Sequence, residues 1–415
     1  MPARRRKAFW AVIAAHFFSA LADNALLIAA IGLLLERHAA AWTIPALRVF
    51  FYLSYIFLAV FVGAIADALP KGRVILATNL FKLAGCGLLL AQIHPLLAYA
   101  LVGLGAAAYS PAKYGILPEL LSPAELVAAN AWMEISTVIA ILLGVALGSL
   151  LMEQGTHIVQ WAGRPALNAT LLVGIVYIAA VLCAAVIPSI ASSPASRASE
   201  LRHPLRLFGD FKNATSTLWH DHDSQISLAV TSLFWAAAAV LQFIVLRWAE
   251  SVLQLALSKA ALLQVAVAVG MVAGALGAAR WVPLRSVLKV LPLGLLMGTL
   301  VLLMLLVTQV WTAVLLLAAI GAMAGLLLVP MNALLQQRGQ LLMHPGQSIA
   351  VQNFHETLAS LVLLAAYGLL IHAGVSILHC IAGFGLFVSM AVGLIMLKQR
   401  ANRRQGCLSA RAAWS

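Results

Sequence analysis

Long apolar runs separated by short polar segments dominate this chain. A membrane-spanning helix needs about 20 mostly apolar residues, and twelve runs of that kind follow one another along the 415 residues. The first six occupy residues 9–35, 46–67, 74–92, 95–116, 127–152 and 166–188. The second six occupy residues 225–250, 260–280, 286–307, 310–335, 347–371 and 374–397. The pattern therefore predicts an all-α polytopic membrane protein with twelve transmembrane helices.

The longest polar stretch, residues 189–224, separates the sixth apolar run from the seventh. It is Ser-rich at its start and contains the residues Pro194, Arg197, Arg202, Arg206 and Lys212. We interpret it as a cytoplasmic linker between an N-terminal six-helix lobe, residues 1–188, and a C-terminal six-helix lobe, residues 225–398. Residues 399–415 would then form a cytoplasmic tail.

The two predicted lobes carry similar residues at matching places. Pro111 is expected to end the fourth span, and Pro330 lies in the tenth span, 219 residues later. Asn130 and Asn353 open the fifth and eleventh spans and are 223 residues apart. Parallel six-helix repeats are typical of two-lobed secondary transporters with a site at the lobe interface. We therefore expect two pseudo-symmetric lobes.

Composition and charge narrow the class of protein. Hydrophobic residues make up 63% of the chain and charged residues only 9%, whereas soluble domains carry roughly 25% charged residues. This excludes an ordinary soluble enzyme, a disordered chain and a nucleic-acid binder. The net charge of +13 is then a topology signal, because cytoplasmic loops carry the excess of Lys and Arg.

The basic residues also orient the chain. With the N-terminus in the cytoplasm, 20 of the 26 Lys and Arg residues fall on the cytoplasmic side and two fall inside spans. The opposite side receives four, namely Arg37, Arg48, Arg164 and Lys259. We predict that both termini are cytoplasmic and that the charge serves no nucleic-acid partner.

Enzymatic chemistry has no candidate residues in this chain. The sequence contains no Walker A motif, no Gly-x-Ser-x-Gly elbow and no HExxH motif, and its four cysteines are scattered without CxxC spacing. The segment from His220 to Asp223 resembles a metal cluster, but no further ligand lies at a suitable spacing, so a solvated cytoplasmic cap in the loop before the seventh span is favoured. We expect no enzyme and no cofactor other than a coupling sodium ion or proton.

The loop between the second and third spans carries a specific sequence motif. It combines Gly63, Asp67, Lys71 and Arg73 and resembles the loop signature of the major facilitator superfamily. Gly63 permits close helix approach, and Asp67 can accept hydrogen bonds from Arg73 or from a neighbouring helix N-terminus. We predict a gating latch here, with an ordinary basic loop as the alternative. The equivalent loop of the second half, residues 277–285, lacks the acid.

Ionisable residues inside spans are functional candidates, because each costs about 2.5–3.5 kcal/mol by insertion scales. Asp23, followed by Asn24, lies in the middle of the first span, Lys82 in the third and Arg247 in the seventh. We expect Asp23 to face a cavity and to meet an ammonium head group or a coupling ion. The alternative is a buried structural pair with Lys82 or Arg247. Arg247 either snorkels to the interface or binds a phosphate, and Lys82 is expected to snorkel.

Two acids occupy matching places in the repeat. Glu134 and Glu356 are expected about one turn into the fifth and eleventh spans, where their helices would frame the cytoplasmic mouth. The alternative is that each acid caps its helix N-terminus, where a negative charge complements the macrodipole.

Several stretches together resemble a known transporter family. They are residues 19–27, 71–74, 103–117, 231–235, 329–339 and 350–353, and the block Ala-Tyr-Ser-Pro-Ala-Lys-Tyr-Gly at 108–115 is the most specific. The chain resembles the lysophospholipid transporter family, a branch of the major facilitator superfamily. The resemblance implies movement of lysophospholipids, chiefly lysophosphatidylethanolamine, from the outer to the inner leaflet of the bacterial inner membrane. It also implies a separate acyltransferase that re-acylates them.

The resemblance implies site residues as well. The positions that match the family pattern are Asp23, Asn24, Lys113, Glu134, Asn353 and Glu356. Gln242 stands where the family pattern has an arginine, and Arg247, about 140° further round the helix, is the candidate substitute for holding the phosphate. His355 and Thr357 also depart from the pattern around Glu356. We place Lys113 with the gating residues.

Two other functions remain open at the level of the sequence. The same fold can export drugs or small amphiphiles, with Asp23 as the proton carrier. The chain can also be a membrane anchor for a lipid acyltransferase without transport activity. The direction of lysolipid transport separates the first alternative from the predicted function, and an Asp23→Asn change without effect on uptake would favour the second.

Overall fold

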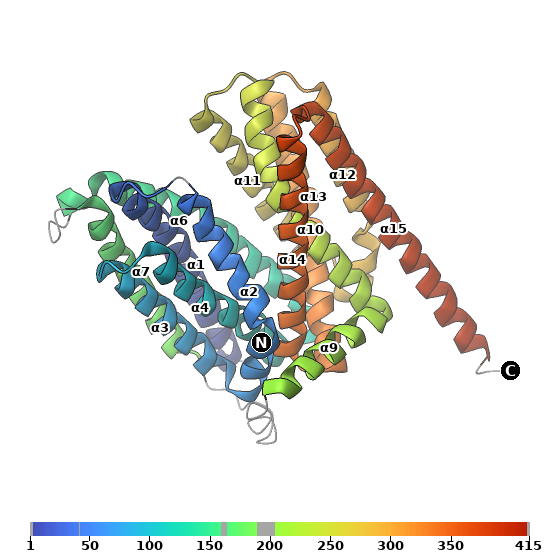
Figure 1. Ribbon diagram of the computed structural model, residues 1–415. Coiled ribbons are helices and arrows are strands. Elements are labelled where there is room, and N and C mark those ends of the chain that lie inside the picture. The colour runs from blue at the N-terminus through green and yellow to red at the C-terminus, as the bar shows by residue number, and fades with distance from the viewer. Residues whose placement is uncertain (1–2, 41, 159–163, 189–203, 413–415) are drawn as a thin grey trace. The chain divides into compact units, whose positions relative to one another are not determined.

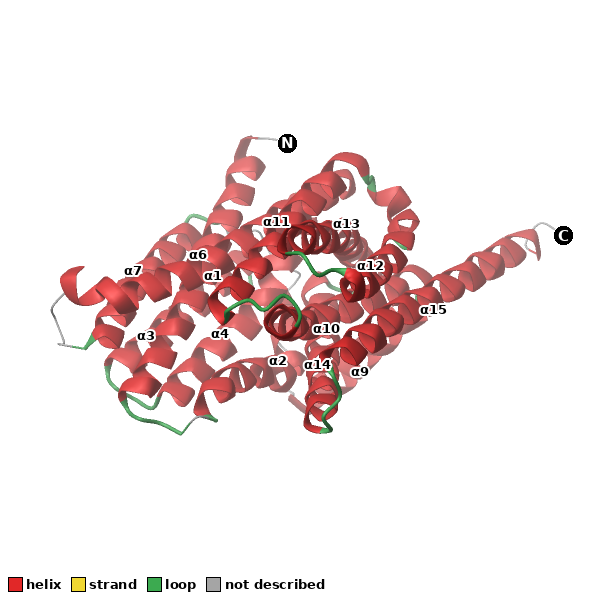
Figure 2. Cartoon of the chain, turned by 90° about the horizontal axis from the view of Figure 1, so that it is seen from above, coloured by secondary structure: helices red, strands yellow, loops and turns green. Residues whose placement is uncertain are grey.

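The computed structural model describes residues 3–40, 42–158, 164–188 and 204–412. Within these ranges all regular structure is helical, as Figure 2 shows. Twelve of the helical segments are long and apolar enough to cross a membrane. The prediction of an all-α chain with twelve spans is therefore confirmed.

The first half contains six spanning helices and two short connecting turns. In chain order they are α1 (Ala3–Glu36), α2 (Thr43–Ala68), α3 (Lys71–Leu90), α4 (Pro95–Gly115), the short α5 (Leu117–Leu120), a 3-10 turn (Pro123–Glu125), α6 (Leu126–Ile158) and α7 (Pro165–Ala185). Proline begins α4 and α7, where its missing N–H costs no intrahelical bond and its fixed φ suits the first turn.

The second half starts with an amphipathic helix in the predicted linker. The order is α9 (Pro204–His220), α10 (His222–Ser251), α11 (Leu257–Trp281), a 3-10 segment (Leu284–Val290), α12 (Pro292–Leu303), a 3-10 turn (Met304–Leu306), α13 (Val310–Leu342), α14 (Pro345–His372) and α15 (Ile377–Ala412). Residues 189–203 of the linker, including Pro194, Arg197 and Arg202, lie outside the described residues.

Three sequence expectations about helix ends are wrong. Pro111 does not end the fourth span, because α4 continues through it to Gly115; membrane helices tolerate proline where neighbouring groups satisfy the released carbonyl. Glu134 is the ninth residue of α6 and Glu356 the twelfth of α14. Both acids therefore lie two to three turns into their helices, and capping is excluded because the macrodipole acts only within the first turn.

The chain forms two compact units that do not coincide with its halves. Unit 1 contains Met1–Ser122, Ile135–Thr215 and Gly339–Phe354, and unit 2 contains Pro123–Glu134, Ser216–Arg338 and His355–Ser415. The first turns of α6 thus belong to unit 2, and the first turns of α14 belong to unit 1. The lobe boundaries at residues 188 and 225 stay a prediction.

Equivalent helices pack together in each unit. In unit 1, α1 and α3 both pack on α7, and α2 and α3 pack on α4 (Figure 1). In unit 2, α10 and α12 both pack on α15. The sixth span of each half therefore packs against the first and third spans of the same half, as expected for six-helix repeats. Leu26 and Tyr177 lie in the core of unit 1, and Trp248 and Ile381 in that of unit 2.

Glycine pairs allow α11 and α13 to approach closely. A Cβ atom at Gly270 or Gly274 would overlap the backbone of α13, and one at Gly321 or Gly325 would overlap the backbone of α11. Both pairs have the small-xxx-small spacing that lets membrane helices pack backbone to backbone.

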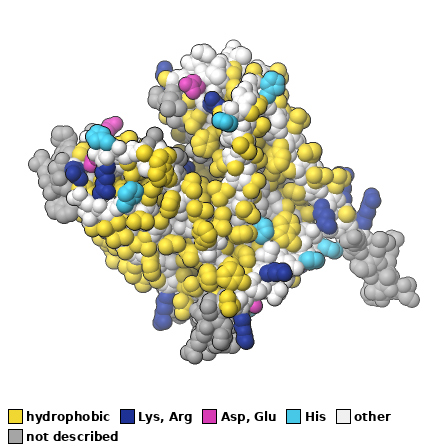
Figure 3. All heavy atoms as spheres, viewed as in Figure 1, with side chains coloured by type: hydrophobic (Ala, Val, Ile, Leu, Met, Phe, Trp, Pro, Cys, Tyr) yellow, Lys and Arg dark blue, Asp and Glu magenta, His cyan; other side chains and the backbone are white. Residues whose placement is uncertain are grey.

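Large apolar side chains cover the outside of the helices. Phe57 is 68% exposed, Leu182 63% and Val362 61%, and the face drawn in Figure 3 is mostly hydrophobic. Apolar surface of this extent is rare in a soluble monomer and suits a chain embedded in lipid.

Candidate functional site

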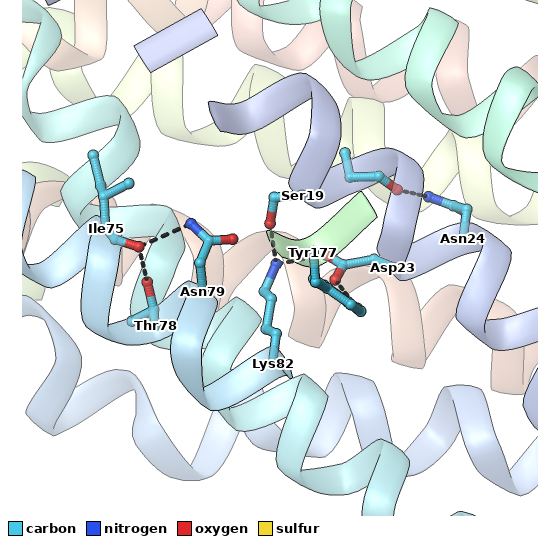
Figure 4. Close-up of polar contacts among 9 residues, drawn as sticks. Ser19, Asp23, Asn24, Ile75, Thr78, Asn79, Lys82 and Tyr177 are labelled. Carbon is cyan, nitrogen blue, oxygen red and sulfur yellow. Dashed lines mark hydrogen bonds and ion pairs between the residues drawn. The ribbon is translucent and has the colours of Figure 1, made fainter. Parts of the chain in front are cut away.

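A buried ion pair links three helices of unit 1. The Lys82 ammonium on α3 donates to the Asp23 carboxylate on α1 over 2.6 Å and to the Ser19 hydroxyl over 2.9 Å. The Tyr177 hydroxyl on α7 donates to the second carboxylate oxygen of Asp23 over 2.7 Å. Figure 4 shows Lys82 and Tyr177 pointing toward Asp23, and Ser19 pointing toward Lys82.

The pair with Lys82 is one of the two structural pairs that the sequence offered for Asp23. The other basic residue expected for such a pair, Arg247, belongs to unit 2. Lys82 is 1% exposed, so the expectation that it snorkels is wrong, because a carboxylate and a hydroxyl satisfy its charge inside the protein. The Asn24 amide donates to the Ala20 carbonyl one turn earlier in α1.

Asp23 and Lys82 also border a pocket inside unit 1. The pocket has a volume of about 100 Å³ and is lined by His16, Ser19, Ala20 and Asp23 of α1, Tyr55 of α2, Lys82 of α3, and Ala106, Tyr109, Ser110 and Lys113 of α4. Drug-sized ligands occupy roughly 300–1,000 Å³, so this volume suits a head group and not a whole lipid. Asp23 thus borders this pocket, while its predicted contact with an ammonium head group or a coupling ion stays a prediction.

The lining is polar and carries both signs of charge. Two lysines and one carboxylate give it a net positive charge when His16 is neutral. The ring of Tyr109 lies 4.9 Å from the Lys82 ammonium and 5.9 Å from that of Lys113, and the ring of Tyr114 lies 4.2 Å from the latter. Cation–π contacts of this length stabilise desolvated ammonium groups, which explains how Lys113 is buried in the wall of the pocket.

His16 joins the pocket to α6. Its Nε2 is 2.8 Å from the Thr137 hydroxyl, and its ring stacks on Tyr109 at 6.2 Å between centroids. Sequence reasoning selected neither His16 nor Tyr109. The signal for His16 was present, because His16, Ser19 and Asp23 follow the i, i+3, i+7 spacing of one helix face.

A second polar cluster lies in unit 2, where α6 begins. The side-chain amides of Asn130 and Gln336 exchange two hydrogen bonds of 2.8 Å each. One turn further along, the Asn332 amide donates to the Glu134 carboxylate over 3.4 Å. Glu134 is 1% exposed, so it is a buried member of an α6–α13 contact.

The remaining substrate candidates are spread over both units. In unit 1 the Asn353 amide donates to the Ser110 hydroxyl of the pocket wall over 2.9 Å. In unit 2 Glu356 is half-buried on α14, and Gln242 and Arg247 are exposed on α10. The Gln242 carbonyl accepts a 3.0 Å hydrogen bond from Gln264.

The loop motif forms a buried charged cluster in unit 1. The two oxygens of the Asp67 carboxylate accept hydrogen bonds of 2.8 Å from the backbone N–H groups of Gly346 and Gln347, in the first turn of α14. The Lys71 ammonium lies 3.5 Å from Asp67 and donates to Glu119 over 2.5 Å. Of the two donors expected for Asp67, the structure shows the helix N-terminus, where a carboxylate complements the macrodipole.

Gly63 and Arg73 complete the motif. A Cβ atom at Gly63 would lie 2.8 Å from the Gln347 Cα atom, so the expected close helix approach is between α2 and α14. Arg73 is exposed on α3. Lys113, predicted as a gating residue, borders the pocket, and its role in gating stays a prediction.

The segment from His220 to Asp223 joins α9 to α10 and holds no metal-ligand cluster among the described residues. Asp221 caps α10 by accepting a 2.9 Å hydrogen bond from the Ser224 N–H, and it pairs with Arg338 of α13. Burial alone would raise the pKa of Asp221, but the hydrogen bonds from Arg338 and Ser224 outweigh it and lower the pKa. Among the described residues no group of three acidic, histidine or cysteine side chains is placed to hold a metal.

The family follows from comparison with known proteins. Residues 12–363 match the family model of the Major Facilitator Superfamily. The chain is 40% identical over 394 residues to the lysophospholipid transporter LplT of Photorhabdus laumondii, covering 95% of this chain and 96% of that protein. It is 43% identical over 365 residues to LplT of Yersinia pestis, with 88% and 87% covered. The chain belongs to the LplT family.

Solved structures agree with this family's fold. The human organic anion transporter MFSD10 superposes with a TM-score of 0.68 at 18% identity, covering 97% of this chain and all of that one. The transporter FucP in its outward conformation gives 0.71 at 14% identity, with 95% and 98% covered. At such identities the likeness concerns the fold alone. LplT relatives are named transporters, so the expectation that this member is not an enzyme is confirmed.

Proposed function

We propose that this LplT-family protein carries lysophospholipids, chiefly lysophosphatidylethanolamine, to the cytoplasmic leaflet of the bacterial inner membrane by alternating access. The observation that carries the proposal is the charged pocket of unit 1, bordered by Asp23, Lys82 and Lys113 within apolar helices. The names of the relatives support the same substrate class. A lysophospholipid needs this combination, because its zwitterionic head requires charged partners and its single acyl chain requires apolar surface.

Asp23 is the proposed partner of the ammonium group. An ionised carboxylate offers about four lone-pair sites, and Lys82 and Tyr177 each use one. Asp23 borders the pocket, where its remaining sites would accept hydrogen bonds from the ammonium group. Asn24, Glu134, Asn353, Glu356, Gln242 and Arg247 are proposed to complete the substrate path.

The Asp67 cluster is the proposed gate. Opening would break the bonds from Asp67 to the first turn of α14 and separate Gly63 from Gln347. Lys71, Arg73 and Lys113 would contribute the charges that restore the closed arrangement. Charge-assisted hydrogen bonds contribute about 1.5–3 kcal/mol each, so the gate would be held firmly but reversibly.

The proposal includes a membrane location for the protein, an acyltransferase as a functional partner and a coupling ion. The excess of basic residues in the loops supports a multi-pass protein of the inner membrane with both termini in the cytoplasm. Lysolipid delivered to that leaflet would reach a separate acyltransferase. A sodium ion or a proton bound at Asp23 would drive the cycle.

Reconstitution into proteoliposomes tests the proposal. Fluorescent lysophosphatidylethanolamine is added outside, and the fraction that becomes resistant to extraction by albumin is followed with and without sodium and proton gradients. We expect uptake that the Asp23→Asn variant reduces at least tenfold. Movement only outward would favour the exporter of amphiphiles, and no movement together with retention of an acyltransferase would favour the anchor.

A further inference from the structure

We propose that one exposed face of α9 binds phospholipids with anionic head groups at the membrane surface, and that the bound lipid holds the Asp67 gate closed. The lipid-binding face consists of Leu205, Phe208 and Lys212, all in the part of α9 that belongs to unit 1. The effect on the gate rests on the proposed function, whereas the contact with lipid does not.

This part of α9 has one apolar face that packs on the protein and another that is exposed. At about 100° per residue, Leu207, Phe211 and Ala214 lie together on the first face and are buried or half-buried. Leu205 and Phe208 lie together about 120° away and are 85% and 54% exposed. Packing on the protein therefore accounts for the first apolar face and leaves the second for another partner.

The contacts of α9 place it where spanning helices end. The Phe208 ring packs edge to face on Phe61 with 5.8 Å between centroids, and Phe61 lies two turns before the end of α2. The Gln347 side-chain amide, in the first turn of α14, donates to the Asp210 carbonyl over 3.1 Å. One turn before Phe61, Phe57 is 68% exposed, so the exposed apolar surface of α2 continues onto α9. An amphipathic helix at this level lies in the membrane interface.

The charge on this face favours an anionic head group. Lys212 is exposed and lies about 20° from Leu205 round the helix. The only acid in the sequence of α9, Asp210, is two residues away and therefore points about 160° from Lys212. A lysine beside apolar side chains extends its stem along them and presents its ammonium to the phosphate layer. Basic residues near the surface of a membrane attract anionic lipids.

Gln347 connects the lipid-binding face to the gate. Its side chain donates to α9, and its backbone N–H donates to the Asp67 carboxylate over 2.8 Å. Opening the gate would separate α14 from α2 and thereby move Gln347 away from Phe61, although both residues support α9. Lipid that binds α9 on both supports binds the closed arrangement better, and such a difference in affinity shifts the equilibrium toward it.

Hydrogen–deuterium exchange of the full-length protein tests the proposal. The protein is placed in nanodiscs of phosphatidylcholine with or without phosphatidylglycerol, and exchange is followed in residues 207–215 and in the amides of Gly346 and Gln347, which bond to Asp67. We expect phosphatidylglycerol to slow exchange in both segments about fivefold, the effect of one basic residue at an anionic surface. Free glycerol 3-phosphate, which has no acyl chain, should change neither segment.

Matched variants separate the face from the net charge. Lys212→Gln should remove the effect of phosphatidylglycerol in both segments. Arg206→Gln removes an equally exposed basic residue of α9 that lies about 120° from Lys212, so this control should retain the effect. Leu205→Ser should speed exchange of α9 in both kinds of nanodisc, whereas Leu205→Met keeps an apolar side chain and should not.

The outcomes test each part of the proposal separately. Equal exchange with and without phosphatidylglycerol, or equal losses in Arg206→Gln and Lys212→Gln, would overturn the lipid-binding face. Slowing by free glycerol 3-phosphate as strong as by the lipid would also overturn it, as would slowing of α9 only after an acyltransferase is added, since the partner would then be a protein. Slowing of α9 without slowing at Gly346 and Gln347 would overturn the effect on the gate. Absence of lysolipid transport would contradict the proposed function and leave the exchange of α9 unaffected.

Discussion

The Asp23–Lys82 pair permits a double-mutant cycle with a predicted asymmetry. Lys82 is 1% exposed, and the Asp23 side chain is 15% exposed at the pocket. Asp23→Asn leaves a buried ammonium without its counter-charge, and removing one partner of a buried pair costs about 3–5 kcal/mol. Lys82→Met leaves a carboxylate that borders the pocket and keeps the Tyr177 hydrogen bond, so we expect a smaller cost of about 1–3 kcal/mol.

The double variant should be more stable than Asp23→Asn alone. Replacing both charges by groups of similar shape is often nearly neutral, so the two costs should not add. Unfolding in mixed micelles with increasing SDS measures the free energy of each variant. Thr78→Val is the control, because among the described residues the Thr78 hydroxyl bonds to carbonyls of its own helix, and it should cost less than about 1 kcal/mol.

The reasoning would be refuted by either of two results. Equal costs for the two single variants would mean that the difference in burial does not matter. Additive costs in the double variant would mean that the pair is not coupled, since residues in contact normally show interaction energies of about 0.5–3 kcal/mol.

Three further predictions address the gate, the glycine contact and a helix cap. Asp67→Asn should lower the free energy of unfolding by about 1.5–3 kcal/mol and change transport rate more than substrate affinity, as measured by uptake kinetics; unchanged rates would contradict the gate. Gly270→Ala should destabilise by about 1–3 kcal/mol through overlap with α13, whereas Gly383→Ala, with open space around it, should not; thermal unfolding in detergent compares them. The Asp221 pKa is lower in the folded protein, so its contribution to stability is complete above the ordinary pKa of about 4 and is lost as pH falls through the folded pKa; Asp221→Asn should flatten this acid dependence.

The sequence predicted the spans well, because lipid imposes a simple length and composition on each helix. All twelve predicted runs overlap a spanning helix of the structure. Helix ends were less predictable, because a proline usually stops a helix in water but not where neighbouring groups satisfy the backbone. Pro111, inside α4, is the example.

Contacts between residues on different helices could not be predicted from the sequence alone. Asp23 was selected from the sequence because a charge inside the membrane costs free energy, and Lys82 was named as one of its two partners. The choice between the two partners could not be made, because the spacing of residues along one helix does not determine which face the neighbouring helix presents. Tyr109 was not predicted as a site residue, because an aromatic residue in an apolar run is usually an ordinary residue of the hydrophobic core. Its significance comes from an unpartnered hydroxyl beside two lysines.

Photo-crosslinking tests the central claim most directly, namely that the pocket of unit 1 receives the lysolipid head group. Lysophosphatidylethanolamine with a diazirine in its head group is bound to the full-length protein in nanodiscs, irradiated and mapped by mass spectrometry. The account predicts labels on α1 between His16 and Asp23 and on α4 between Tyr109 and Lys113, removed by excess unlabelled lysolipid. Competable labels confined to α10 around Gln242 and Arg247 would contradict it.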